Sequence, residues 1–541
     1  FTEGGKKATA SFKIPEQFRG YVSFTATDMS GNTSDLFTDD KCIVVDNVAP
    51  GVNVTYDNNE AQNGNFYKAN RTATITISAD NFFPDYLYCP IDNVNGNEDY
   101  LVITVGTQLD NETGYTFANV KPVFTKDGDV YKATVLFDKN ADYKFDIKYT
   151  DKSHNVYDSY QEDVFTVDKT YPTLNVEFSE PAYSNVNQYR EDRTATITIV
   201  EHNFDAKDVV ATVVGKDASG AVQPVSFKDG EGNDVTDYAA YLRNNANWTP
   251  STTDADTYTA AITFSTEVDF TFDIKYTDLA GNVFDSFDEV EFTIDKTAPT
   301  ASIQIGTWTE SIDGTKWTTF PVADKDSRAF GSLSTNEKVT VTINTADTLS
   351  GVDIVKHFRS DKILTLDEVK AHTNWINVTE SKNTFSYDVE PDEQFVVYVY
   401  VVDMAGNEHY VSSDGIILDK TLPTVEKIAP EIIIEPETDK QPINDIYNTD
   451  VDVDVKVVDP TEKGTYSGLK SITYNIYNIN FAGVETKTQE GTLFTFDKTS
   501  GKALVNTYDE AACITVDRTK NNSNTVIIEV IATDNAGNTK T

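Results

Sequence analysis

Hydrophobic and polar residues alternate with a period of two through much of this chain. The clearest runs are RTATITISAD at 71–80, RTATITIVEHNF at 193–204, KVTVTINTAD at 338–347 and VDVDVKVVD at 451–459. Thr, Val and Ile at alternating positions suit a pleated surface with one face packed and the other in water. These runs therefore predict half-buried β-strands, and helical periodicity is almost absent.

A short turn phrase follows a second set of alternating runs. It occurs as TDMSGN at 27–32, TDKSHN at 150–155, TDLAGN at 277–282, VDMAGN at 402–407 and TDNAGN at 533–538. Gly supplies a positive φ at little cost, and an Asp four residues before the Asn can hydrogen-bond turn amides. Because the phrase recurs every ~125 residues, the chain is predicted to be a string of related modules of one small domain each.

A linker phrase of the type V/I-D-K-T-x-P closes each repeat and marks the module boundaries. It reads CIVVDNVAP at 42–50, FTVDKTYP at 165–172, FTIDKTAP at 292–299 and IILDKTLP at 416–423. Pro fixes one backbone angle, so these short linkers leave little hinge freedom. The predicted modules are a partial one at 1–46, full ones at 47–168, 169–295 and 296–419, and one at 420–541 without its last strand.

Short strands, regularly spaced turns and ~125 residues per unit favour an antiparallel two-sheet sandwich for each module. A barrel is less compatible with the sequence, because a linker that contains Pro ends each unit and the next unit begins a new set of strands. One helix is predicted, at 364–374, with Thr365 as N-cap and Glu368 at the capping-box position. The second and third modules share RTATITI, whereas the fourth and fifth share SGV or SGL after the second strand.

The net negative charge of the chain limits the kinds of molecule that it can bind. The chain has 44 Lys and Arg against 87 Asp and Glu, a formal net charge of −43. This balance argues strongly against nucleic acid or an anionic membrane as partner, because phosphate binding requires the opposite sign. Divalent cations and basic partners remain open. No run approaches the roughly 18 apolar residues of a membrane span, so no direct membrane insertion is expected.

The cysteines and histidines give no sign of a repeated reactive site. Cys42, Cys89 and Cys513 fall in three different repeats, so we predict buried free thiols and no disulfide framework. None of the histidines recurs at an equivalent position, and no hydrolase, metalloprotease, nucleotide-binding or EF-hand motif is present. We therefore expect no enzyme, no catalytic residue and no zinc site. The histidines are His154, His202, His357, His372 and His409.

These phrases together resemble a known family, the bacterial immunoglobulin-like repeats of large surface proteins and adhesins, especially from Firmicutes. The resemblance rests on D-x-A-G-N, V/I-D-K-T-x-P, RTATITIVEHNF at 193–204, SGVDIVKHF at 351–359 and YVSSDGIILDKTLP at 410–423. It implies an all-β fold of tandem immunoglobulin-like antiparallel β-sandwiches in an elongated array. It also implies an extracellular location at the cell surface or cell wall, with which a low cysteine content is compatible.

The immunoglobulin-like topology predicts a cluster of acids at every junction between modules. The end of the second strand, the turn before the last strand and the incoming linker share one pole of such a sandwich. Three carboxylates should meet there, one from each of these places. The predicted sets are Asp46, Asp80 and Asp151; Asp168, Glu201 and Asp278; Asp295, Asp347 and Asp403; and Asp419, Asp459 and Asp534.

Such a cluster is costly unless something compensates it. Three carboxylates at roughly 4 Å repel by about 4 kcal/mol per pair at an effective dielectric near 20, which is comparable with the whole stability of a domain, about 5–15 kcal/mol. Three alternatives are open: a hard cation fills the cluster, the side chains splay into solvent as turn caps, or Lys169, Lys296 and Lys420 compensate the charge. Ca²⁺ suits an all-oxygen site, and the resembling repeats include members with calcium between domains.

The sequence therefore predicts a non-enzymatic stalk or adhesin segment, semi-rigid, that projects or presents a binding surface toward a host or cell-surface protein or glycan. One alternative is a specific binder of a host ligand such as immunoglobulin, glycan or matrix, with contacts in the divergent segments 214–257 or 303–337. Another is a set of accessory domains of a surface glycoside hydrolase or other enzyme. We expect the chain to be a piece of a longer protein whose signal and anchor lie outside it.

Overall fold

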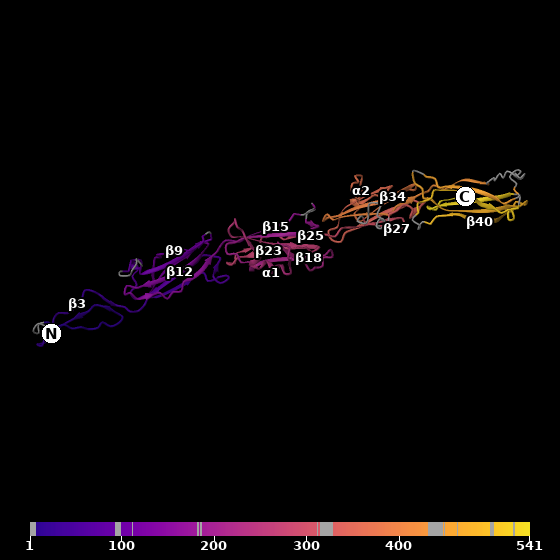
Figure 1. The fold of residues 1–541 in the computed structure, drawn as a ribbon. Helices are drawn as coiled ribbons and strands as arrows, with labels where there is room; N and C mark the ends of the chain where they lie inside the picture. Colours follow the sequence, from indigo (N-terminus) through magenta and orange to yellow (C-terminus); the bar gives the residue numbers. More distant parts are fainter. Residues whose placement is uncertain are drawn as a thin grey trace.

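The computed structural model shows an elongated chain of β-rich units that follow one another from the N-terminus to the C-terminus (Figure 1). Nearly all regular structure is strand, and the sheets are small and mostly antiparallel, as the alternating pattern predicted. The parallel pairs among the described residues are β6 (Phe66–Tyr67) with β14 (Asp163–Val167), β16 (Gln188–Tyr189) with β25 (Val290–Ile294) and β29 (Leu333–Thr335) with β36 (Ile416–Leu418). The structure describes residues 7–91, 99–110, 112–180, 183, 187–310, 312–313, 328–430, 447, 449–461, 464–497, 502–522 and 525–541.

The second module packs two sheets against each other. The first has the spatial order β5-β7-β11-β10, and the second β6-β14-β12-β8-β9 with β13 beside β12. This is the strand order of an immunoglobulin-like sandwich. Its strands are β5 (Gly51–Tyr56), β6 (Phe66–Tyr67), β7 (Arg71–Ser78), β8 (Leu101–Leu109), β9 (Thr116–Asn119), β10 (Thr125–Asp127), β11 (Val130–Phe137), β12 (Ala141–Thr150), β13 (Val156–Tyr157) and β14 (Asp163–Val167), with the 3₁₀-helix η1 (Pro84–Tyr86).

The third module repeats this plan and adds a short helix that the sequence did not predict, α1 (Tyr238–Leu242), which Asp237 caps. Its sheets are β15-β17-β22-β19-β20, with β21 beside β22, and β16-β25-β23-β18, with β24 beside β23. The strands are β15 (Thr173–Phe178), β16 (Gln188–Tyr189), β17 (Arg193–Val200), β18 (Val209–Lys216), β19 (Phe227–Asp229), β20 (Asp234–Val235), β21 (Thr249–Pro250), β22 (Thr257–Phe264), β23 (Val268–Thr277), β24 (Val283–Phe284) and β25 (Val290–Ile294), with the 3₁₀-helices η2 (Ala206–Asp208) and η3 (Asn245–Asn247).

The fourth module contains the helix predicted at 364–374, here α2 (Leu366–Lys370), with both hydrogen bonds of the Thr365–Glu368 capping box in place. Its sheets are β27-β26-β30-β33 and β28-β35-β34-β31-β32, with β36 between β34 and β29. The strands are β26 (Thr300–Ile305), β27 (Trp308–Glu310), β28 (Ile312–Asp313), β29 (Leu333–Thr335), β30 (Val339–Ala346), β31 (Val352–Ser360), β32 (Ile376–Asn377), β33 (Thr384–Val389), β34 (Glu393–Asp403), β35 (Glu408–Ser412) and β36 (Ile416–Leu418), with the 3₁₀-helix η5 (Thr379–Ser381).

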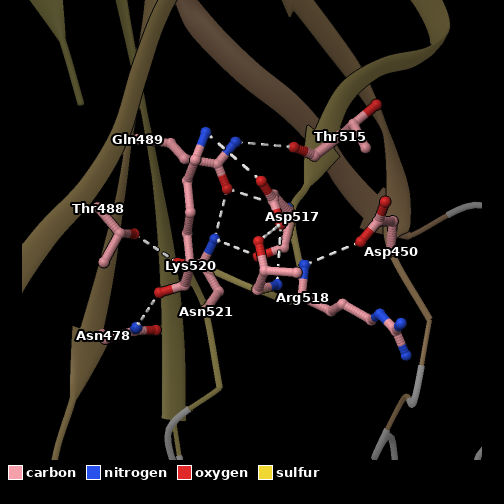
Figure 2. Close-up of polar contacts among 10 residues, drawn as sticks. Asp450, Asn478, Thr488, Gln489, Thr515, Asp517, Arg518, Lys520 and Asn521 are labelled. Atoms are coloured by element: carbon pink, nitrogen blue, oxygen red, sulfur yellow. Dashed lines mark hydrogen bonds and ion pairs between the residues drawn. The ribbon is translucent and has the colours of Figure 1, made fainter.

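The fifth module packs the sheet β37-β38-β41 against the sheet β40-β39-β42-β43. At the pole away from the fourth module, hydrogen bonds hold the loop after β41. Figure 2 shows Asn521 bonding Thr488 and Gln489, and Arg518 N donating to Asp450. The strands are β37 (Thr424–Pro430), β38 (Val451–Val458), β39 (Leu469–Ile479), β40 (Glu485–Thr495), β41 (Thr507–Val516), β42 (Thr525–Asp534) and β43 (Thr539–Lys540).

In the segment 7–46, all of which the structure describes, each strand pairs with one other strand. β1 pairs with β4, and β2 pairs with β3, so they form a two-stranded ribbon. The aromatic side chains of this ribbon, such as Phe24 and Phe37, are exposed. The strands are β1 (Phe18–Gly20), β2 (Ser23–Phe24), β3 (Phe37–Thr38) and β4 (Ile43–Val45).

Each of the four sandwiches has its own apolar core, formed by the alternate residues that the sequence pattern selected. In the second module Ala73, Ile75 and Ile77 of β7 are fully buried, while the residues between them are only partly covered. The prediction that the cysteines are buried free thiols is confirmed for their being free and wrong for their burial. All three thiols are free, but Cys42 is exposed and the other two are partly exposed, because Cys42 lies in the two-stranded ribbon that has no core above it.

Candidate cation sites at the module junctions

The sandwich topology brings the linker of one module to a pole of the next. The last strand of a module ends in the linker Asp, and the following module places the end of its second strand and its Asp-x-x-Gly-Asn turn at the same pole. We number the junctions by their linker Asp: first (Asp46), second (Asp168), third (Asp295) and fourth (Asp419).

At the second junction three acids from two modules converge in a buried cluster. Asp168 follows β14, Glu201 follows β17, and Asp278 follows β23. One carboxylate oxygen from each lies within 4.8 Å of the others, and all three side chains are at most 5 % exposed. Thr170 N donates to Asp168 Oδ1 at 3.0 Å and Asn203 N to Glu201 Oε1 at 2.9 Å. Asn282 N and Nδ2 donate to the two oxygens of Asp278, both at 2.8 Å, so these four donors face the three acids.

The third junction builds the same arrangement with additional backbone donors. Oxygens of Asp295, Asp347 and Asp403 lie within 4.8 Å of one another. Ser350 N donates to Asp295 Oδ2 at 2.9 Å, and Gly351 N donates to Asp347 Oδ1 at 2.7 Å. The Ser-Gly pair shared by the fourth and fifth modules thus points two amides at two of the acids.

The fourth junction is the most deeply buried. Asp419, Asp459 and Asp534 are at most 1 % exposed, and their oxygens lie within 4.8 Å of one another. Ser467 N donates to Asp419 Oδ2 at 2.7 Å, and Gly468 N to Asp459 Oδ2 at 2.6 Å. The second oxygen of Asp459 has no hydrogen-bond partner among the described residues, although it is shielded from solvent. A buried carboxylate oxygen in that state is costly unless a cation or proton satisfies it.

The Asn of the turn phrase ties each acidic turn to the preceding linker. In every case its side-chain amide donates both to the turn Asp and to the backbone carbonyl of the linker Asp. At the second junction Asn282 Nδ2 donates to Asp278 Oδ2 at 2.8 Å and to the Asp168 carbonyl at 3.1 Å. The corresponding bonds to the linker carbonyl are 3.2 Å from Asn155, 2.8 Å from Asn407 and 2.7 Å from Asn538.

Burial raises the pKa of several of these acids. Loss of solvent is the largest cause for each of them, and neighbouring carboxylates add to it for Asp168, Glu201, Asp403, Asp459 and Asp534. The pKa of Asp278 is also raised by burial. The raised pKa values are about 8 for Glu201, about 7 for Asp459 and about 6 for Asp168, Asp403 and Asp534. Near neutral pH a cluster without a cation therefore carries protons that a cation would displace.

Two of the three alternatives for the acids can now be judged. The side chains do not splay into solvent, because the acids of the second and fourth junctions are almost completely buried. Two of the three lysines act elsewhere: Lys169 Nζ donates to Asn70 and to the Asp138 carbonyl, and Lys296 Nζ pairs with Asp192 at 2.6 Å. The buried clusters could hold a cation or a proton as the compensating charge.

The first junction does not match the prediction. Asp80 is exposed, and it forms no acidic cluster with Asp46 and Asp151. The error is one residue of register: β7 and β17 are both eight residues long, so Glu201 corresponds to Ala79. Asn81 occupies the space instead and donates to Asp46 Oδ2 at 2.7 Å.

Sequence reasoning also missed a second line of contacts between modules. Arg190 Nη1 donates to the Gly406 carbonyl at 3.0 Å, and Tyr183 lies against the same glycine. At the fourth junction Ser334 Oγ donates to the Asn535 carbonyl at 2.7 Å. Gly406 and Asn535 belong to the repeated turn phrase, but their partners Arg190, Tyr183 and Ser334 lie outside the repeated phrases. Of the divergent segment 303–337, residues 314–327 lie outside the described part.

Comparison with known proteins assigns no family. No protein-family model and no curated protein matches the chain. A structure of dimeric latent PorU from Porphyromonas gingivalis is similar over 69 % of this chain and 34 % of its own, with 10 % identity and a TM-score of 0.15. Escherichia coli alpha-2-macroglobulin activated by porcine elastase is similar over 91 % and 43 %, with 9 % identity and a TM-score of 0.13.

This chain spans about a third of the first protein and less than half of the second. Among the described residues, no helix is long and apolar enough to cross a membrane.

Proposed function

We propose that this chain is a non-enzymatic stalk of an extracellular bacterial surface protein, and that Ca²⁺ bound at three module junctions stiffens it. The second, third and fourth junctions are the proposed sites. The stalk projects or presents a binding surface toward a host or cell-surface protein or glycan. The resemblance of the repeat phrases to surface repeats and the linear arrangement of the modules support this role (Figure 1).

One observation carries the proposal: buried three-acid clusters recur at the second, third and fourth junctions. In each of them the linker Asp comes from one module and the other two acids from the next. An ion held by all three carboxylates would therefore cross-link consecutive modules. Such a cross-link restricts bending at a place where the covalent linker is only a few residues long.

The chemistry of the donors favours calcium. Every acid in the clusters offers oxygen, and no His or Cys joins them. Hard cations prefer oxygen ligands, and Ca²⁺ accepts six to eight of them in flexible geometry, with waters and carbonyls completing the shell. Mg²⁺ requires a tighter octahedron and gives up its waters reluctantly, and zinc prefers sites with nitrogen or sulfur.

Calorimetry and scattering test this function together. Metal-stripped protein titrated with CaCl₂ should give saturable binding, and the maximum dimension from small-angle X-ray scattering should increase when calcium is added. The variant Asp278→Asn should lose one site while the other two remain. Absence of binding heat, together with a melting temperature that EDTA does not change, would overturn the calcium stalk.

A further inference from the structure

The residue directly after the second strand differs between otherwise equivalent modules. β7 and β17 begin with the same seven residues, RTATITI, and both end after the eighth. The next residue is Glu201 in the third module and Ala79 in the second. The first junction therefore lacks a carboxylate at the position that completes the cluster at the second junction.

Neutral donors occupy both oxygens of the linker Asp at the first junction. Asn81 Nδ2 donates to Asp46 Oδ2 at 2.7 Å, and Val48 N and Gln17 Nε2 donate to its Oδ1 at 3.1 and 3.3 Å. The oxygens of Asp151 accept from Ser153 N and from Asn155. Among the described residues, each of these four carboxylate oxygens has a donor, so no cation is required to satisfy them.

The first junction is also connected across the modules without an ion. Arg19 of the N-terminal ribbon donates through Nη1 to Asn81 Oδ1 at 3.5 Å, while Asn155 Nδ2 donates to the Asp46 carbonyl. Asn81 therefore donates from its side-chain nitrogen to the linker Asp46 and accepts at its side-chain oxygen from Arg19 of the preceding segment. Among the described residues no group of three acids forms here, whereas three acids meet at each of the other junctions.

The third and fourth junctions retain buried polar atoms that nothing in the described structure satisfies. At the fourth, the Oδ1 atom of Asp459 and the hydroxyl of Ser467 are fully buried and have no partner. At the third junction, the hydroxyl of Ser350 is also buried without a partner, while the backbone amide of Ser350 donates to Asp295. These unpartnered oxygens lie beside the three-acid clusters and provide additional ligand atoms or anchors for bound water.

We propose that the single residue after the second strand decides whether a junction takes a divalent cation, so that the first junction is an amide-bonded connection without a cation. This inference rests on the proposed calcium sites at the other three junctions. The stalk then has two kinds of joint: three that respond to calcium and one, between the N-terminal ribbon and the second module, that does not.

The test is the number of calcium ions bound by the full chain and two variants. Calorimetry and native mass spectrometry with CaCl₂ should give three ions for the unmodified protein. Ala79→Glu should raise the number to four, because it restores the missing acid in the register of Glu201. Ala79→Gln has the same length without charge and should leave it at three.

A local measurement checks the same claim without relying on affinity. Hydrogen exchange after chelation should accelerate at the amide of Thr170, which bonds the linker Asp of the second junction, and leave that of Val48 at the first unchanged. Three ions in both the unmodified protein and Ala79→Glu, or four in the unmodified protein, would overturn the assignment. No bound calcium in any variant would instead overturn the proposed function on which it rests.

Discussion

The second and fourth junctions place three acids at equivalent positions, but the local structure around the acids differs. At the second, Glu201 reaches the cluster from the end of β17, and Asn203 N is the hydrogen-bond donor to its carboxylate. At the fourth, the shorter Asp459 is accompanied by a Ser-Gly pair whose amides donate to Asp459 and to Asp419. The fourth junction therefore supplies backbone donors from its Ser-Gly pair that the second junction lacks.

The comparison predicts that the second junction depends most on its ion. Burial raises the pKa of Glu201 to about 8 and that of Asp459 to about 7, so in both clusters the charged form is disfavoured when no ion is bound. Amides at the fourth junction remain when an ion leaves, whereas at the second junction Asp168 and Glu201 accept, among the described residues, only from Thr170 N and Asn203 N. The experiments below test this ranking.

Removal of calcium should have the largest effect. At free calcium one hundred times the dissociation constant, each site stabilises the folded state by about 2.7 kcal/mol. EDTA should therefore lower the melting temperature, and hydrogen exchange should show greater loss of protection at Thr170 than at Thr421, whose amides bond the two linker acids. Equal loss at the two amides, or more at Thr421, would contradict the ranking.

The pH dependence of the metal-free protein is the next largest effect. A raised carboxyl pKa means that the folded state keeps a proton which the unfolded state has already released. Stability should therefore fall as the pH rises from about 4.5 to about 8 for Glu201, and from about 3.8 to about 7 for Asp459. The slope is about 1.4 kcal/mol per pH unit for each full proton difference.

Denaturant unfolding of metal-free protein at pH 5 and pH 8 measures this slope. Glu201→Gln should flatten the curve more than Asp459→Asn does, because its titration window is wider. A curve that is unchanged by both substitutions would show that these acids do not hold protons in the folded state.

Loss of the turn Asn should have an intermediate effect. Asn282→Ala removes a buried amide that bonds Asp278 and the Asp168 carbonyl, and we expect a loss of about 2 kcal/mol. Asn32→Ala is the matched control, since Asn32 makes the same bond to Asp28 in an exposed turn, and it should cost at most about 0.5 kcal/mol. Similar losses in the two variants, measured by chemical denaturation, would show that the bond to the linker contributes nothing.

The smallest effect concerns the glycine of the Ser-Gly pair. Gly351 and Gly468 have φ values of +84° and +81°, so an alanine at either position is strained by about 1 kcal/mol. Gly468→Ala should cost about 1 kcal/mol more, because the added Cβ would lie 3.1 Å from Leu504 Cβ, whereas the space beside Gly351 is open. Equal melting temperatures for the two variants would contradict this difference.

The repeat phrases made the fold and most of the clusters predictable. A turn Asp every ~125 residues and a linker Asp after each closing strand define two of the three acids directly from the sequence. The third depends on where the second strand ends. Asp80 was a wrong choice because the run RTATITISAD gives no signal that the strand stops at Ser78, and one residue of register changes the direction of a side chain.

Other parts of the site depend on three-dimensional proximity. The amides of Ser350 and Ser467 lie next to the linker acids only because the loop after the second strand folds back over the pole. Likewise, Lys296 follows Asp295 in the sequence, yet its ammonium group pairs with Asp192. Neighbours in the sequence were thus a poor guide to which charges meet.

The location of the ions tests the central claim most directly. Crystals of the protein grown with calcium and measured for anomalous scattering should show one peak among the three carboxylates of each of the second, third and fourth junctions, and no peak between Asp46 and Asp151. Occupied clusters would establish the junctions as cation-linked joints. Anomalous maps without peaks at those three clusters, at saturating calcium, would contradict the account.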